Sequence, residues 1–492
     1  MRIYNHWHLS ILALAIHFSS ATPVDAGREI TTDSGILHGF IDPSSPAVLQ
    51  FLGVPFALPP TGGRRWLPPM SFNDSSVSIH TTAFGPSCPQ IPLSTQLTPN
   101  VFSAKGGNRT EFFPVEEFSE DCLTLNVWTP VRKKGTNLRV LVWFFGGAFL
   151  QGGSNSLYFN PTSWVQRTQG HIVVSINYRV NIFGFPNAPG LEVQNLGLLD
   201  QRAALEWVRT NIGAFGGDPG RIVAWGESSG AIAVDFLHFV LPADPIVHGS
   251  IMESGTALVP AKISLSNDTA QVNFPQVAAL LGCAPGPSQV DCLRGVSWQD
   301  IEALLGANLT IPNFLPIPDE RVVFADYTAR YAAGAVARVP ALIGTNQHEL
   351  NAVIAHAPGV NINDTLANLT FLCTAAATSR LREAQGLTTF RYRYDGDFGN
   401  ISPTNFSGAY HASELPLIFG TAGLFHGPST AYEDAVSIKL QDLWLDFARD
   451  PQQGLQNARW ESFEAGGAVL LGDSDTPLKA ITAQDLDGSC PL

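Results

Sequence analysis

The chain has 492 residues, of which 45% are hydrophobic and 14% are charged, so its composition is that of a folded protein with a large core. Lysine and arginine number 28 against 42 aspartates and glutamates, which gives a net charge of -14. Such a chain repels polyanions, so we expect no nucleic-acid partner. No internal stretch approaches the roughly 18 uninterrupted apolar residues of a membrane-spanning helix, so we expect no membrane span.

The first 26 residues have the features of a secretory signal peptide. Arg2 gives a positive start, residues 9–18 are mostly apolar, and small residues follow near positions 21 and 26, where we expect cleavage. A membrane anchor is the alternative, but the apolar run is short and His17 interrupts it. We therefore expect a secreted, extracellular protein. Residues 27–492 contain no repeat or long linker, which predicts a single domain.

Sequons and the carboxyl end of the chain agree with that route. The carboxyl end carries neither a retention tetrapeptide nor an apolar tail for a lipid anchor, which favours release outside the cell. Asn-x-Ser/Thr sequons predict N-glycosylation of a secreted chain. The eight sequons begin at Asn73, Asn108, Asn267, Asn308, Asn363, Asn368, Asn400 and Asn405.

Cysteine usage fits an oxidising compartment. The six cysteines form an even set without a C-x-x-C pair, so neither a zinc ribbon nor a thioredoxin-like motif is present. Sequence alone permits 15 connectivities of six cysteines. Cys283 and Cys292 are the easiest pair, because the segment between them contains Pro285, Gly286 and Pro287 and can turn back sharply. Buried free thiols are the alternative.

Strand and helix signals alternate between residues 138 and 230 and continue later. Continuous apolar runs predict strands that are buried on both faces of a parallel sheet. These runs cover residues 138–145, 171–177, 221–225, 339–344 and 389–394. Between the second and third runs, the spacing of Leu199, Ala203, Trp207 and Ile212 predicts a helix with one buried stripe. Alternating strands and helices predict an α/β fold, with a central, mostly parallel, twisted sheet flanked by helices.

The third run leads directly into Gly226-Glu-Ser-Ser-Gly230, followed by an apolar segment, 231–240, that suits a helix. A G-x-S-x-G at a strand-to-helix turn has the position of a nucleophile elbow. The glycines permit the tight turn, and Ser228 would project its hydroxyl while the amides that open the helix face the reaction site. We therefore expect Ser228 to be a nucleophile.

A serine that attacks a carbonyl needs hydrogen-bond donors for the oxyanion that forms. The first strand ends in Phe145-Gly-Gly-Ala-Phe149, a glycine turn that can aim backbone N–H groups inward. An ordinary glycine turn is the alternative. We favour an oxyanion hole built from the N–H groups of Gly147 and Ala148 and from that of Ser229, the residue after the nucleophile.

Several blocks, in this order, resemble the type-B carboxylesterase/lipase family of α/β-hydrolases, which includes cholinesterases and fungal lipases. The blocks are residues 53–60, Arg64-Arg-Trp66, residues 119–127, Asn177-Tyr-Arg179, residues 195–208 and residues 215–219. The resemblance extends over nearly the whole of residues 27–492. It implies an α/β-hydrolase fold and one catalytic domain that hydrolyses carboxylic esters without a metal or cofactor.

The resemblance also implies a Ser-Glu-His triad in that chain order. Glu349 matches the family's acid and His411 its general base. His411 would take the Ser228 proton and return it to the leaving alcohol, while Glu349 orients the imidazole and stabilises its cation. His348 and Glu349 look like the start of a zinc-binding H-E-x-x-H, but Ala352 occupies the second histidine position, so that interpretation fails.

Weaker implications of the same resemblance concern supporting residues. Ser254 is similar to a serine that supports the triad, with a plain turn serine as the alternative. Glu227 is similar to an acid that joins a buried network, with a purely structural acid as the alternative. The implied disulfides are Cys88–Cys122, Cys283–Cys292 and, as a third, Cys373–Cys490.

Three departures limit what the resemblance carries over. The family's oxyanion segment usually has His or Tyr followed by three glycines. Here Ala148 replaces the third glycine, and its methyl group narrows the space for bulky acyl or tertiary alcohol groups. Ser229 stands where alanine is usual. The 62 positions from Glu349 to His411 are fewer than in cholinesterases or fungal lipases, so no oligomeric state is implied.

The loop between Cys88 and Cys122 bears on the substrate. It contains no tryptophan, so it lacks the cation–π platform that choline esters would need. It does contain aromatic residues and two glycines, which fit a mobile lid or, alternatively, a static covering loop. The aromatic residues are Phe102, Phe112, Phe113 and Phe118. Phe144 and Phe149 flank the oxyanion turn and suggest an apolar pocket.

Together these features predict a secreted serine carboxylesterase that cleaves a small-molecule ester through an acyl-enzyme. The alternatives are a triglyceride lipase, an acyltransferase or tailoring enzyme with the same triad, and a non-catalytic adhesion protein, which would normally have lost Ser228 or His411. If His411 titrates normally, activity should fall as the pH drops through about 6 to 7.

Overall fold

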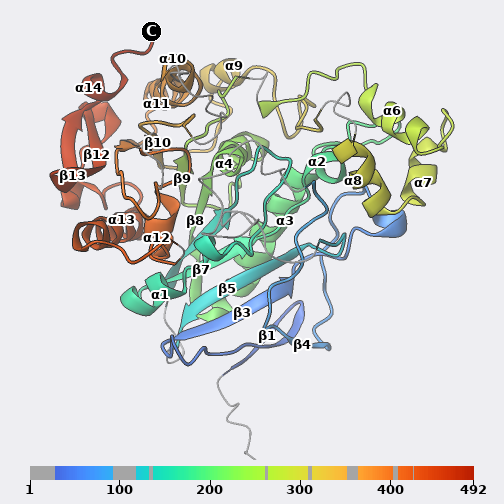
Figure 1. Ribbon diagram of the computed structural model, residues 1–492, viewed down its shortest axis with the longest axis horizontal. Coiled ribbons are helices and arrows are strands. Elements are labelled where there is room, and N and C mark those ends of the chain that lie inside the picture. Colours follow the sequence, from blue (N-terminus) through green and yellow to red (C-terminus); the bar gives the residue numbers. More distant parts are fainter. Residues whose placement is uncertain are drawn as a thin grey trace, which may run out of the picture.

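The computed structural model describes residues 28–91, 118–131, 137–260, 264–307, 313–351, 364–402, 408–424 and 426–491. One large sheet runs through the centre of the molecule (Figure 1). Across that sheet the strands are β13 (Thr476–Thr482), β12 (Gly467–Asp473), β11 (Thr389–Tyr394), β10 (Ala341–Asn346), β9 (Gly249–Glu253), β8 (Gly217–Glu227), β6 (Leu138–Phe144), β7 (His171–Ile176), β5 (Thr124–Pro130) and β3 (Val48–Pro55).

Neighbouring strands are parallel from β12 through to β7 and antiparallel only at the two edges, in the pairs β12–β13, β5–β7 and β3–β5. The mostly parallel sheet expected from the apolar runs is therefore confirmed. A second, small sheet lies at the same end of the molecule as β3. Its strands are β1 (Glu29–Thr32), β2 (Gly35–His38) and β4 (Ser78–His80).

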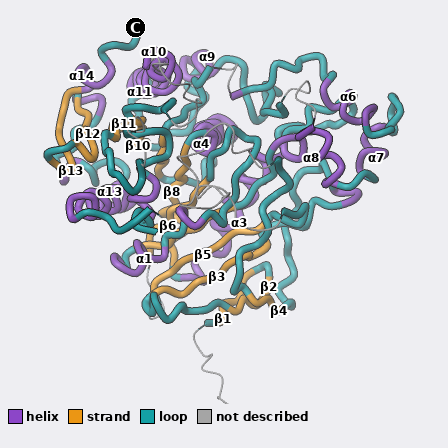
Figure 2. Tube along the Cα trace, in the orientation of Figure 1, coloured by secondary structure: helices purple, strands orange, loops and turns teal. Residues whose placement is uncertain are grey.

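Helices connect and cover the strands, as the tube in Figure 2 shows. The α-helices of the described chain are α1 (Thr162–Thr168), α2 (Asn181–Gly184), α3 (Leu196–Asn211), α4 (Ser229–Val240), α6 (Asn273–Leu280), α7 (Gln289–Arg294), α8 (Trp298–Ala307), α9 (Tyr327–Ala332), α10 (Asp364–Ala367), α11 (Cys373–Ala384), α12 (Leu415–Phe419), α13 (Ala431–Arg449) and α14 (Ala483–Asp487). None of them is long and apolar enough to cross a bilayer.

Both faces of the sheet are buried, which is why its strands have no polar alternation. Along β6, Leu141 and Trp143 join a cluster with side chains of α1, α12 and α13. Their neighbours Val140 and Val142 point the other way and join a cluster with side chains of α3 and α4. Successive strand residues point to opposite faces, so a strand covered on both sides becomes a continuous apolar run.

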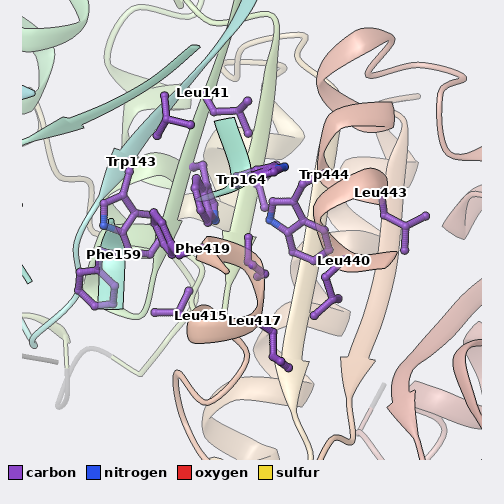
Figure 3. Close-up of a cluster of buried hydrophobic side chains, with 14 of the residues drawn as sticks. Leu141, Trp143, Phe159, Trp164, Leu415, Leu417, Phe419, Leu440, Leu443 and Trp444 are labelled. Atoms are coloured by element: carbon purple, nitrogen blue, oxygen red, sulfur yellow. The ribbon is translucent and has the colours of Figure 1, made fainter. Parts of the chain in front are cut away.

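The short helix α12 is anchored in the first of these clusters, and this matters because His411 lies just before it. Figure 3 shows Leu415, Leu417 and Phe419 of α12 packed among aromatic side chains of the sheet and α13. The Phe419 ring stacks on Trp225 of β8, with 4.8 Å between ring centroids, and meets the Trp143 ring edge-on. Buried aromatic packing therefore fixes the segment that follows His411 against the strand that precedes Ser228.

Helix α3 differs in part from the stripe predicted for it. Trp207 is buried as expected, but Leu199 and Ala203 are only half-buried. Asp200, a polar residue of the same helix, is fully buried, because it forms a two-point ion pair with Arg179 at 2.7 and 2.8 Å. The helix thus faces the loop after β7 as well as the sheet, and a periodicity of apolar residues alone could not show that second contact.

Three disulfides join the cysteines, in the pairs that the family resemblance implies: Cys88–Cys122, Cys283–Cys292 and Cys373–Cys490. The expected signal segment, residues 1–26, lies outside the described residues. So do three of the four aromatic residues expected in a lid, namely Phe102, Phe112 and Phe113.

Four of the eight sequons fall in the described chain. Asn73 and Asn267 are exposed and Asn368 is half-buried. Asn400 is 9% exposed, and its amide nitrogen already donates a hydrogen bond to the Ala422 carbonyl. The remaining four lie outside the described residues: Asn108, Asn308, Asn363 and Asn405.

Candidate active site

Ser228 lies in the sharp turn between β8 and α4, at the carboxyl edge of the parallel strands. Its φ of 54° is in the left-handed region, which a non-glycine residue adopts only under tight constraint. The glycines on either side are required by packing. A Cβ at Gly226 would lie 2.5 Å from the Gly230 carbonyl carbon, and one at Gly230 would collide with the Phe144 carbonyl oxygen. The local structure is therefore the elbow predicted from the motif.

The glycine turn after β6 leaves the sheet beside this elbow, because β6 and β8 are adjacent and parallel, with Phe144 opposite Gly226. Within the described chain, the backbone N–H groups of Gly147, Ala148 and Ser229 donate no hydrogen bond. Ser229 is the first residue of α4, where a helix leaves its N–H groups unpaired. The three amides named from the sequence are thus available to a bound group.

Phe144 and Phe149 do not form the apolar pocket suggested by their positions. Phe144 is fully buried in the core beneath the sheet, since it is the last residue of β6 and points to the face covered by α3 and α4. Phe149 is 1% exposed and packs edge-on against Phe185. Both rings are therefore part of the protein core.

Glu349 and His411 come from different loops and meet next to the elbow. His411 Nδ1 lies 2.6 Å from Glu349 Oε2, within charge-assisted hydrogen-bond distance. Glu349 follows β10, and backbone contacts join its loop to the histidine loop, since the His348 N–H donates to the Ala409 carbonyl at 2.9 Å. The Phe371 ring lies beside the imidazole, with 5.0 Å between ring centroids and 43° between the ring planes.

Ser254 links the end of β9 to the acid Glu349. It follows β9, which lies between β8 and β10 in the sheet. Its hydroxyl donates to Glu349 Oε1 at 2.7 Å, and its backbone N–H donates to the Gly344 carbonyl of β10. The side chain is fully buried. The position of Ser254 is therefore that of a residue that orients the carboxylate, whose other oxygen contacts His411.

Comparison with known proteins identifies the family. A family model described as Carboxylesterase family matches residues 26–361. The chain is 41% identical to a chlorogenic acid esterase of Aspergillus niger over 94% of both chains. The chain belongs to the carboxylesterase family. It is also 38% identical to secreted lipase 5 of Gibberella zeae over 93% of both chains, and 36% identical to secreted lipase 1 of Botryotinia fuckeliana over 67% of this chain and 63% of the relative.

This membership shows that the protein is a carboxylic ester hydrolase with the α/β-hydrolase fold, as the sequence blocks implied. Its relatives include proteins named as an esterase and as secreted lipases, so the family assignment alone does not choose between those two kinds of ester hydrolase.

In this carboxylesterase, the second imidazole nitrogen faces Glu227. His411 Nε2 lies 3.0 Å from Glu227 Oε1, and no hydrogen bond joins Ser228 Oγ to His411, although both residues are described. Burial alone would lower the pKa of His411, but the carboxylates of Glu227 and Glu349 raise it to about 9. The fall in activity near pH 6 to 7 was expected for a histidine that titrates normally; because two acids favour the imidazolium here, we now expect that fall at higher pH.

Sequence reasoning missed two further residues of this carboxylesterase. Asn346, three positions before Glu349, donates its backbone N–H to Glu349 Oε1 at 2.8 Å, and its side-chain amide donates to Glu414 and to the Tyr410 carbonyl. Glu414, three positions after His411, is 1% exposed. Each of these two residues is three positions from an expected triad residue, which was visible in the sequence. The sequence did not indicate that their two side chains contact each other.

The buried acids around His411 share one electrostatic environment. Burial raises the pKa of Glu227 to about 7, against the opposing effect of His411. Burial and the charge of neighbouring acids also raise the pKa of Glu253 and Glu414. Trp444 of α13 donates to Glu253 Oε1 at 2.9 Å, so this acid is tied to the aromatic core. Several carboxyl groups this close cannot all ionise, so the charge on His411 depends on their combined protonation.

Proposed function

We propose that this carboxylesterase is a secreted serine esterase that works through an acyl-enzyme, with Ser228 as nucleophile, His411 as general base and Glu349 as the acid that orients it. The main support is the 2.6 Å contact between His411 Nδ1 and Glu349 Oε2 beside the strained elbow that carries Ser228. Family membership supports the same chemistry.

The proposed reaction begins when Ser228 Oγ attacks the ester carbonyl carbon and its proton passes to Nε2 of the neutral His411. Negative charge develops on the carbonyl oxygen, where the free N–H groups of Gly147, Ala148 and Ser229 would stabilise it. The tetrahedral intermediate expels the alcohol, which takes the proton from Nε2. Water then attacks the acyl-enzyme by the same steps and releases the carboxylic acid.

Glu349 and Ser254 act on the imidazole without touching the substrate. Glu349 holds Nδ1–H, which leaves Nε2 as the nitrogen that exchanges protons, and its charge stabilises the imidazolium formed at each step. The hydroxyl of Ser254 fixes the other carboxylate oxygen. This reaction requires no metal or cofactor.

The substrate class we propose is a small carboxylic ester, because a relative that matches over 94% of both chains is named for the ester chlorogenic acid. Triglyceride hydrolysis is the second candidate, supported by the relative named secreted lipase 5. Initial rates on chlorogenic acid and on a series of aryl and glycerol esters, each measured below and above its solubility limit, separate the two. An esterase saturates below that limit, whereas a lipase gains activity sharply above it.

The triad is tested by Ser228→Ala and His411→Ala in the full chain. Each should lower kcat on a soluble p-nitrophenyl ester by about 10³-fold or more, with circular dichroism and thermal unfolding unchanged. Wild-type turnover in a folded Ser228→Ala protein would overturn the assignment.

Secretion and glycosylation belong to the same proposal. Support comes from the apolar amino-terminal segment, the three disulfides and the relatives named as secreted lipases. Amino-terminal sequencing of protein from the culture medium should give a start just after residue 21 or 26, and endoglycosidase treatment should lower the mass. Protein that stays in the cells with its first residue intact would contradict the proposal.

A further inference from the structure

The turn from Phe145 to Phe149 is held in an unfavourable backbone conformation. Gly147, Ala148 and Phe149 have φ values of 118°, 58° and 61°, so three residues in succession are in the left-handed region. Each non-glycine residue there costs about 1–2 kcal/mol. Such a turn persists only where its surroundings impose it. Because the expected oxyanion donors are in this turn, whatever holds it also sets the direction of their N–H groups.

Two side chains hold the turn, one at each end. The Phe149 N–H donates to Ser229 Oγ at 3.2 Å. At the other end, the Tyr178 hydroxyl donates to the Phe145 carbonyl at 2.5 Å, and the Tyr178 ring stacks on the Phe145 ring with 4.1 Å between centroids and 9° between planes.

These two hydrogen bonds act on opposite ends of the same buried turn. Burial raises the pKa of the Tyr178 hydroxyl, so this group stays a neutral hydrogen-bond donor. The Ser229 hydroxyl therefore accepts from the Phe149 N–H, and the Tyr178 hydroxyl separately donates to the Phe145 carbonyl. All four side chains are at most 2% exposed, so water does not compete for these hydrogen bonds.

We propose that the Ser229 hydroxyl is a positioning group that clamps the turn 145–149 onto the nucleophile elbow, so that its N–H groups converge on the same point as the N–H of Ser229 itself. This inference rests on the proposed function of Ser228. An alanine at position 229 would keep the backbone donor but leave the Phe149 N–H without its partner. An orphaned buried N–H costs about 1–3 kcal/mol, which is comparable to the strain of the turn, so the turn would relax away from the elbow.

The test compares Ser229→Ala with wild type in the full chain, using a soluble p-nitrophenyl ester and an aryl trifluoromethyl ketone. Ser228 Oγ adds to the ketone carbon while its proton passes to His411, and the resulting oxyanion occupies the proposed hole. We expect kcat to fall about 10- to 100-fold with KM changed less than about threefold, and the ketone affinity to fall by the same factor as kcat/KM. The pH midpoint of kcat/KM should stay unchanged, because His411 is not touched.

Three further variants keep the outcome decisive. Tyr178→Phe keeps the ring stacking, so it should fold even where Ser229→Ala proves unstable. Its kcat and its affinity for the ketone should fall as in Ser229→Ala, but by a smaller factor. In the double variant Ser229→Ala/Tyr178→Phe, kcat should fall by less than the product of the two single-variant factors, because both hydroxyls act on one turn. Ser379→Ala is the matched control: the hydroxyl of this fully buried serine of α11 donates to the Ala375 carbonyl, far from the turn in sequence, and its loss should leave kcat unchanged.

The failures of the two proposals are distinguishable. Wild-type kcat and ketone affinity in Ser229→Ala or in Tyr178→Phe, with Ser228→Ala inactive, would overturn the clamp and leave the triad standing. A fall in thermal stability with kcat and ketone affinity intact would also overturn it, since a purely structural serine has that signature. An active Ser228→Ala would overturn the proposed function itself.

Discussion

Replacing Glu227 by glutamine should move the acid side of the pH–activity profile to lower pH. The Glu227 carboxylate lies 3.0 Å from His411 Nε2, and the glutamine keeps its shape while removing its charge. Two unit charges 3 Å apart interact by about 5.5 kcal/mol at an effective dielectric constant of about 20. At about 1.4 kcal/mol per pKa unit, this sets an upper limit of about four pKa units on the effect.

The expected effect is smaller than that limit. The pKa of Glu227 is itself raised to about 7 by burial, so the group is only partly ionised near neutral pH, and Glu349 still favours the imidazolium in the variant. We therefore expect the pKa of His411 to fall by about one to two units. The imidazole must be neutral to accept a proton, so kcat/KM rises with pH through this pKa, and a lower pKa moves the rise to lower pH.

The assay measures kcat/KM from pH 5 to 10. Hydrolysis is monitored by titrating the acid that it releases, so that the ionisation of a coloured product does not interfere. Glu302→Gln is the matched control, because burial also raises the pKa of Glu302, to about 7, but its carboxylate contacts Asn181 rather than His411. A wild-type midpoint near 6.5 that stays in place in Glu227→Gln would refute the reasoning. The plateau at high pH should also drop in the variant, because the imidazolium formed during catalysis loses a partner.

Two predictions concern stability. Replacing both Cys373 and Cys490 by serine opens a disulfide between positions 117 residues apart. It should lower the free energy of unfolding by about 3–5 kcal/mol, measured by denaturant titration. An unchanged midpoint would show that the disulfide does not constrain the unfolded chain. Asp200→Asn leaves the guanidinium of Arg179, whose side chain is 3% exposed, without a charged partner. It should lower the free energy of unfolding by about 3–5 kcal/mol in the same titration. A loss below about 1 kcal/mol would count against this prediction.

Much of the fold could be predicted from the sequence because its determinants are local. The apolar runs at 138–145, 171–177 and 389–394 became β6, β7 and β11 within one residue at each end, since strands buried on both faces need no alternation. The elbow was predictable for a related reason. Its two glycines are required by contacts within five residues of sequence and with the neighbouring strand, so the motif and the geometry carry the same information.

Helix α3 shows where local pattern stops being informative. Its predicted stripe placed Leu199 and Ala203 inward, yet both are only half-buried and the helix buries Asp200 instead. Asp200 is buried because it forms an ion pair with Arg179 in the loop after β7. The same limit applies to Phe144 and Phe149, which were expected at a pocket and are packed in cores. In each case the deciding partner is distant in sequence, and an apolar or polar residue type is compatible with more than one such partner.

Electrostatics at the site are the extreme case of this limit. The pairing of His411 with Glu349 was implied by a family motif, but Glu227 also raises the pKa of His411, and Glu414 adds a smaller contribution. These carboxylates come from the ends of β8, the loop after β10 and the residues before α12, which only the register of the sheet brings together. A charge acts through space rather than along the chain, so the pH dependence expected for His411 moves to higher pH once those distances are known, while the identity of the expected base stays the same.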